Sequence, residues 1–165
     1  MASKATIQDV LNEGFQAVNF GNPANFVTAG TGIVDSLLAR ASNWASTKVT
    51  AANYTAATTG YVFDCLVRAE VAYASQALWL RRVNFLDGAA TVGLESDKKA
   101  NLLQKARDLA DDAQADQIFW IGEAQRALGL DVQADIPGTG ASTGIVETGM
   151  MPQTIPAARN YGAAQ

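Results

Sequence analysis

Four aspartates, Asp108, Asp111, Asp112 and Asp116, form the densest group of chemically capable side chains in the sequence. Placed on a helix, residues at this spacing share a face. Clustered carboxylates can hold a divalent cation, but no histidine or cysteine stands beside these four, and the stretch lacks the glycine of a calcium-binding loop. We therefore expect a solvated acidic face, or a face that docks on the arginines of a neighbour, in preference to a metal site.

The residue types that most enzymes rely on are scarce. The chain has no histidine, which removes the usual general base, the commonest zinc ligand and any Ser-His or Cys-His pair. Its single cysteine, Cys65, lies within an apolar stretch and is expected to be a buried, unreactive thiol. Carboxylate-pair chemistry stays open, but most Asp and Glu residues fall on polar helix faces. We predict that the protein is not an enzyme and carries no catalytic, cofactor or metal site.

Arg81 and Arg82 form the basic pair of a long apolar stretch. At a helix C-terminus such cations satisfy exposed carbonyls and interact favourably with the macrodipole. The sharper alternative is a contact with a phosphate or with a partner's carboxylate. Arg81 and Arg82 are therefore candidate partner-binding residues.

Composition narrows the choice of partner. The chain has 165 residues, a net charge of -4 and only 17% charged residues. This length allows one domain with a sizeable core, and so little charge favours a surface that is partly covered by partners. The acidic balance argues against sequence-independent binding of nucleic acid. With no apolar run of membrane-spanning length and no apolar signal core, we expect a soluble protein that is neither membrane-bound nor secreted.

Helix signals predict three elements besides the long central stretch. Thr6 to Glu13 opens with a capping-box pattern and predicts a short helix. Ile33 to Val49 shows helical apolar spacing. A last helix follows Leu94 and stops at Gly129, and its basic first half and acidic second half oppose the macrodipole. That order indicates that the positions of these charges are determined by contacts outside the helix.

The connections carry aromatic anchors. Phe15 to Gly32 contains a Gly-Asn-Pro turn signal and predicts an ordered loop whose aromatics pack on the core, with a brief strand or hairpin as the alternative. Thr50 to Ala57 predicts a plain connection, anchored by Tyr54.

The stretch from Asn53 to Asp87 organises the rest. It has no proline and a single glycine, Gly60, and its apolar residues occupy most of a helix's circumference. A surface helix normally shows one apolar stripe. We expect a long helix from about Thr59 with neighbours on several sides, supplied by the same chain or by copies of it in an oligomer.

The sequence thus predicts an all-α fold, a bundle of about four helices with a long central helix over residues 1–130. Residues 131–165 hold three of the four prolines and read as an extended C-terminal arm that orders on a partner, with a floppy tail as the alternative. Its spaced apolar residues are the candidate partner-binding anchors: Ile136, Ile145, Val146, Met150, Met151, Ile155 and Tyr161.

Three segments carry a family resemblance. The T-x-x-D-V-L pattern of Thr6 to Leu11, the I-V-D-S-L-L-A-R-A-S stretch of Ile33 to Ser42 and the R-A-E-V-A-Y-A stretch of Arg68 to Ala74 follow one another in a helical layout over residues 6–128. In this order they resemble the head–tail connector (adaptor, or head-completion) proteins of tailed bacteriophages. The chain departs from that layout in the long Phe15 to Gly32 insertion and in the extended arm.

The resemblance implies a structural virion protein at the head–tail interface, assembled in the host cytoplasm. Such a protein forms a homo-oligomeric ring, commonly of twelve copies, beneath the portal protein, extends the DNA channel without reading its sequence, and docks a stopper or tail protein. Two alternatives stay open: a cytoplasmic helical interaction module that binds a partner through its arm, and a small enzyme using Asp and Glu. A buried carboxylate cluster would favour the enzyme.

Overall fold

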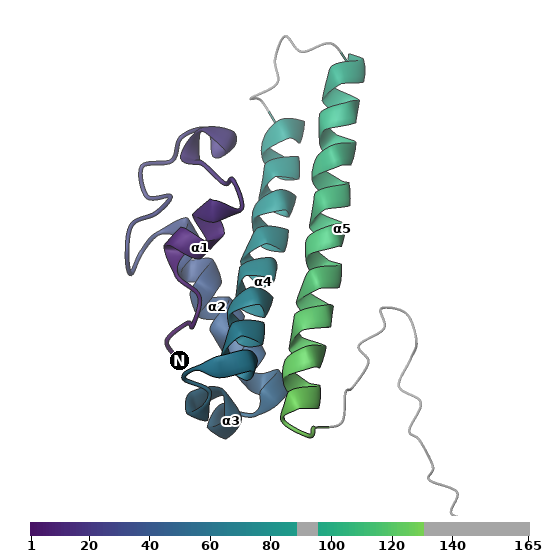
Figure 1. Ribbon diagram of the computed structural model, residues 1–165. Coiled ribbons are helices and arrows are strands. Elements are labelled where there is room, and N and C mark those ends of the chain that lie inside the picture. The colour runs from purple at the N-terminus through teal and green to yellow at the C-terminus, as the bar shows by residue number, and fades with distance from the viewer. Residues whose placement is uncertain (89–95, 131–165) are drawn as a thin grey trace, which may run out of the picture. The chain divides into compact units, whose positions relative to one another are not determined.

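The protein folds as an all-α bundle, and the structure, a computed structural model, describes residues 1–88 and 96–130. In chain order the helices are α1 (Ile7–Asn12), the short 3-10 helix η1 (Ala17–Phe20), α2 (Ile33–Val49), α3 (Ala51–Ala56), α4 (Gly60–Asp87) and α5 (Ser96–Ala127). α4 and α5 lie side by side along most of their lengths, while α1 and α2 pack on another side of α4 (Figure 1). The predicted all-α class and long central helix are confirmed.

The N-terminal helix begins at the predicted capping box. The backbone N–H of Asp9 donates to Thr6 Oγ1 at 3.2 Å, and the backbone N–H of Thr6 donates to Asp9 Oδ2 at 2.8 Å. These two reciprocal bonds satisfy donors that a helix N-terminus otherwise leaves without partners.

The loop from Phe15 to Gly32 packs its aromatics inward, as predicted. Phe15, Phe20 and Phe26 are all buried, and the rings of Phe20 and Phe26 stack with centroids 5.1 Å apart. Apart from η1 the described loop has no regular structure, so the alternative of a strand or hairpin there is wrong.

Two apolar clusters line α4. Toward its C-terminal half, Ala74 and Leu78 pack with residues of α1, α2 and the Phe15–Gly32 loop; toward its N-terminal half, Leu66 and Ala69 pack with residues of α2, α3 and α5. The central helix therefore does have neighbours on several sides. They come from the same chain, so its many-sided apolar surface does not require further subunits.

The prediction of a plain connection over Thr50 to Ala57 is wrong, because this segment contains the helix α3. The segment Ala51–Ala56 is helical, and it follows α2 directly because Thr50 takes the unusual dihedral angles φ 72° and ψ 147°. A threonine rarely adopts a positive φ, and no turn signal of the Gly or Pro kind announces this reversal. Tyr54 is only 3% exposed, so the predicted anchor is confirmed.

The last helix ends at Ala127, and Gly129 forms its C-terminal stop, as predicted. This glycine has a φ of 66°, its N–H donates to the carbonyl of Arg126, and the N–H of Leu130 donates to the carbonyl of Gln125. That pair of bonds is a Schellman motif, which glycine favours because it has no Cβ. In the part of the chain that the structure describes, none of the helices is both long enough and apolar enough to cross a membrane.

Candidate functional site

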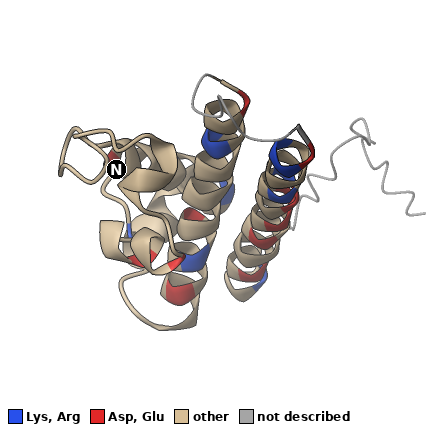
Figure 2. Ribbon diagram, turned by 90° about the horizontal axis from the view of Figure 1, so that it is seen from above, with Lys and Arg blue, Asp and Glu red and all other residues tan. Residues whose placement is uncertain are grey.

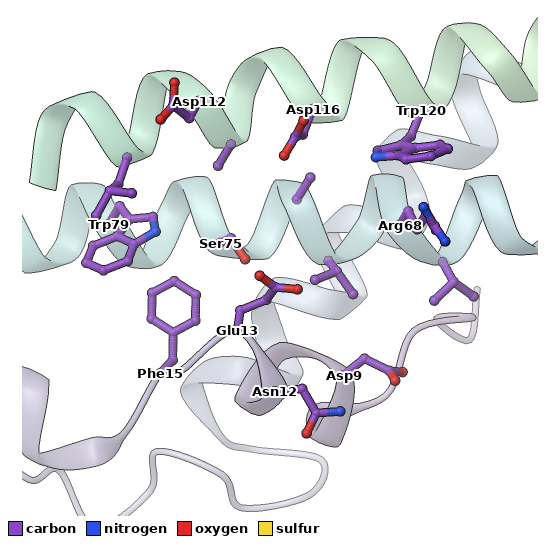
Figure 3. A pocket seen from close by; sticks show the side chains of 15 residues that line it. Asp9, Asn12, Glu13, Phe15, Arg68, Ser75, Trp79, Asp112, Asp116 and Trp120 are labelled. Atoms are coloured by element: carbon purple, nitrogen blue, oxygen red, sulfur yellow. The ribbon is translucent and has the colours of Figure 1, made fainter.

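A groove of about 540 Å³ opens between α1, α4 and α5 (Figure 3). It lies beside the middle of the α4–α5 pair, and it brings together residues that are a hundred positions apart in the sequence. Its polar and aromatic lining residues are Asp9, Asn12, Glu13, Phe15, Arg68, Ser75, Trp79, Asp112, Asp116 and Trp120.

Opposite walls of the groove are acidic. Asp112 and Asp116 come from α5, whereas Asp9 and Glu13 come from α1 and its C-terminal end (Figure 3). Asp9 is engaged with Thr6, but the carboxylates of Glu13, Asp112 and Asp116 make no hydrogen bond or ion pair with another described residue. Three solvent-accessible carboxylates thus face one cleft without partners, which favours a cationic occupant.

Aromatic rings close the two ends of the groove. At one end the rings of Phe15 and Trp79 lie with centroids 5.0 Å apart; at the other, the guanidinium carbon of Arg68 lies 4.4 Å from the centroid of the Trp120 ring. The second arrangement is a cation–π contact, in which the ring's negative face attracts the guanidinium. Arg68 is the only Lys or Arg among the lining residues.

Ser75 gives the groove a polar group that the protein leaves unsatisfied. The residue is 7% exposed, and its Oγ is buried without a hydrogen-bond partner in the part of the chain that the structure describes. Figure 3 places Ser75 on α4 between Trp79 and Arg68, across from Glu13. Leaving a buried hydroxyl unpaired costs on the order of 1–3 kcal/mol. A ligand that fills the groove is one way to satisfy it.

A separate polar site lies inside the bundle. Glu70 is fully buried, and its Oε2 accepts from the backbone N–H groups of Lys4 and Ala5, each at 2.9 Å, and from Ser3 Oγ at 2.5 Å. Its Oε1 accepts from Tyr54 Oη at 2.5 Å. Both carboxylate oxygens are engaged by the fold, so the role that this geometry supports is to hold the N-terminal segment against α3 and α4.

Lys4 completes that site. Its Nζ donates to the carbonyl of Ala57 and lies 4.5 Å from the centroid of the Tyr54 ring. Burial lowers the pKa of Lys4, and the negative charge of Glu70 raises it in part. Burial and the hydrogen bond to Glu70 both raise the pKa of Tyr54.

The structure shows where the aspartates of the predicted acidic face lie. Asp108, Asp111, Asp112 and Asp116 are all exposed, but only Asp112 and Asp116 line the groove. Within residues 1–88 and 96–130, no group of three or more His, Cys, Asp or Glu side chains could hold a metal ion. Cys65 is buried, as expected, and burial raises the pKa of its thiol.

Arg81 and Arg82 lie outside the groove, near the C-terminal end of α4. Arg81 is exposed, while the guanidinium carbon of Arg82 lies 5.6 Å from the centroid of the Phe85 ring, and burial lowers the pKa of Arg82. The structure does not bring this pair together with the acidic residues. The anchors predicted in the arm, Ile136 to Tyr161, lie outside the described residues, so they stay predictions.

Sequence reasoning missed both Glu70 and the α1 wall of the groove. A signal for Glu70 was present, because it is a lone carboxylate flanked by Ala69 and Val71 in a helix that is apolar on most sides. Such a position requires hydrogen-bonding partners. No local signal could have shown that Glu13 and Ser75 line the same groove as Asp112, because only the tertiary fold places α1 and α5 along one groove with α4.

Comparison of the chain with protein-family models, with curated proteins and with solved structures found no match in any of the three.

Proposed function

We propose that the protein is a structural component of a phage virion, an adaptor that assembles as a homo-oligomeric ring between the portal and the stopper or tail and extends the DNA channel. The proposal rests first on the resemblance of three segments to head–tail connector proteins. These segments belong to α1, α2 and α4, three of the elements that build the bundle core.

The observation that carries the proposal furthest is the exposed surface of α5. α4 and a smaller part of α2 cover one side of this helix, and its remaining surface is open within the described structure. Leu102, Ile118 and Phe119 are 41%, 38% and 51% exposed there. Large apolar side chains beside unpaired charges are typical of surfaces that bind other proteins.

The interior supports an assembly role better than a catalytic one. Glu70, the fully buried carboxylate, is held by four hydrogen bonds that tie three segments together. The carboxylates of the groove are spread along two exposed walls. We therefore assign the protein to binding and assembly, with no cofactor.

The test is to mix the purified protein with the portal protein of the same phage and to examine the product by light scattering and negative-stain electron microscopy. A ring with a central hole, formed alone or on the portal, is the expected result. A protein that stays a compact monomer and never joins the portal overturns the proposal. A monomer in the absence of portal does not, because assembly can depend on the portal.

A truncation separates the adaptor from the alternative of a module that acts through its arm alone. Removal of residues 131–165 should leave helicity by circular dichroism nearly unchanged for residues 1–130 and should impair assembly on the portal. A truncated chain that assembles as the full chain does would remove the arm from the mechanism. A large loss of helicity would show that the arm belongs to the folded bundle.

A further inference from the structure

We propose that the acidic groove between α1, α4 and α5 receives cationic side chains from the basic end of a second copy of this chain. The inference rests on the proposed self-assembly and names the contact that would hold two copies together. It starts from two groups of opposite charge that form no ion pair with each other in the described part of the molecule.

The basic group lies where α4 ends and α5 begins. Half of the chain's 12 Lys and Arg residues fall there: Arg81, Arg82, Lys98, Lys99, Lys105 and Arg107. In Figure 2, the blue residues of α5 gather at the end that adjoins the grey connection, and red residues follow further along the helix. Arg81, Lys105 and Arg107 are exposed, and their side chains have no hydrogen bond or ion pair with another described residue. We call these three residues the free cations of the basic end.

The groove has the chemistry to hold such a cation. Toward its Trp79 end, the groove is lined by the carboxylates of Glu13 and Asp112, the hydroxyl of Ser75 and the ring of Trp79 (Figure 3). A guanidinium or ammonium there gains ion pairs, a hydrogen bond to the serine oxygen and an aromatic face. The contact of Arg68 with Trp120 at the other end shows the same pairing made within the molecule.

The molecule's own basic end adjoins this space but forms no ion pair across it among the described residues. Lys105 lines a neighbouring pocket that shares Trp79 and Leu109 with the groove, and its side chain has no ion pair with another described residue. Lys105 precedes Asp112 by seven residues and Asp116 by eleven on one continuous helix. At 1.5 Å of rise per residue, their backbones are about 10 and 16 Å apart. A second copy that is reversed or shifted along α5 has no such restriction and brings unlike charges together. Two copies in parallel register would instead oppose like charges, which is unfavourable.

Charge reversal on each side tests the pairing. One variant carries Asp112→Lys and Asp116→Lys, and the other carries Arg81→Glu, Lys105→Glu and Arg107→Glu. Sedimentation velocity over a concentration series at low and high salt measures self-association of the wild type and of each variant. We expect the wild type to associate more tightly at low salt and each variant to associate about tenfold more weakly or worse. An equimolar mixture of the two variants should recover association, because the reversed groove of one now fits the reversed end of the other.

Asp108→Lys with Asp111→Lys is the matched control, since it makes the same charge change on the same helix outside the groove. It should associate nearly as the wild type does. The pairing is overturned if this control weakens association equally, if the mixture of reversed variants stays monomeric, or if the wild type stays monomeric at every concentration and salt tested. Should a Lys variant unfold by circular dichroism, Asp112→Asn with Asp116→Asn replaces it.

Ser75→Ala separates binding from folding. Because the hydroxyl has no hydrogen-bond partner among the described residues, its removal should leave thermal stability unchanged or raise it, while self-association weakens severalfold. Unchanged association overturns the role of the hydroxyl in the groove. If the wild type assembles on the portal and every groove variant assembles equally well, this interface is overturned and the adaptor function stands. If the wild type self-associates as described but never joins the portal, the adaptor function is overturned and this interface stands.

Discussion

Tyr54 Oη donates to Glu70 Oε1 at 2.5 Å inside the core, and this contact ties the short helix α3 to the long helix α4. Both residues are almost completely buried. The same tyrosine hydroxyl lies 3.1 Å from the carbonyl oxygen of Ala2, so it also touches the N-terminal segment. One buried carboxylate thereby organises three parts of the chain that the sequence separates widely.

Tyr54→Phe should destabilise the protein by about 1–3 kcal/mol, because Glu70 loses a hydrogen-bond donor in a place that water does not reach. Chemical denaturation followed by circular dichroism measures the change. Tyr73→Phe is the matched control, since the hydroxyl of Tyr73 has no hydrogen bond to another described residue and its ring still packs on Trp44. Equal losses in the two variants would show that the Tyr54–Glu70 bond contributes nothing specific.

The stability that Tyr54 contributes should vanish in alkali. Its pKa is raised above the ordinary value of 10.0 by burial and by Glu70, so the folded state keeps a proton that the unfolded state releases. A raised pKa gives stability that is fully present below about pH 10 and is lost as the pH rises further. The lowered pKa of Lys4 acts in the opposite direction near the same pH, because that group favours folding more when it is neutral.

Comparison with Tyr54→Phe isolates the tyrosine, since Lys4 is present in both proteins. The free energy of unfolding is measured between about pH 8 and about pH 11.5, a range that spans the ordinary tyrosine pKa of about 10. The difference between wild type and variant should stay constant up to about pH 10 and shrink above it. A difference that grows with pH would contradict the assigned direction of the shift.

The N-terminal segment should contribute most to the free energy of unfolding when Glu70 is present. Deletion of residues 1–5 removes the donors from Ser3, Lys4 and Ala5 and leaves a buried carboxylate with Tyr54 alone. Stranding a buried charge in this way costs on the order of 3–5 kcal/mol. The same deletion in a Glu70→Met background strands no charge and should cost clearly less. Equal costs in both backgrounds, measured as a double-mutant cycle, would mean that the carboxylate does not hold the segment.

Local signals in the sequence located the helices well where capping and spacing are strong. The Thr6–Asp9 capping box, the bounds of α2 and the stop at Gly129 could all be predicted because each depends on neighbours within a few residues. α3 could not be predicted, because its start depends on the positive φ of Thr50. A threonine at that position gives no signal of such a backbone conformation.

The candidate site could not be predicted from local signals, because it depends on tertiary packing. The acidic residues of α5 were visible as a pattern, but the sequence could not tell that Asp112 and Asp116 face α1 while Asp111 does not line the groove. The burial of Ser75 and Glu70 likewise depends on contacts over long sequence separations. Periodicity shows which residues share a helix face, whereas the identity of the facing element comes from packing.

The central helix offers the sharpest test of the packing itself. Leu66 is fully buried among residues of α2, α3 and α5, whereas Leu80 on the same helix is 48% exposed. Leu66→Ala should cost about 2–5 kcal/mol, because it removes buried methyl groups and leaves a cavity. Leu80→Ala, the matched control, should cost less than about 1 kcal/mol. Leu66→Asp should prevent folding altogether, since it buries an unpaired charge. Thermal melts that rank the two alanine variants equally, or a stable Leu66→Asp protein, would contradict the position of α4 at the centre of the bundle.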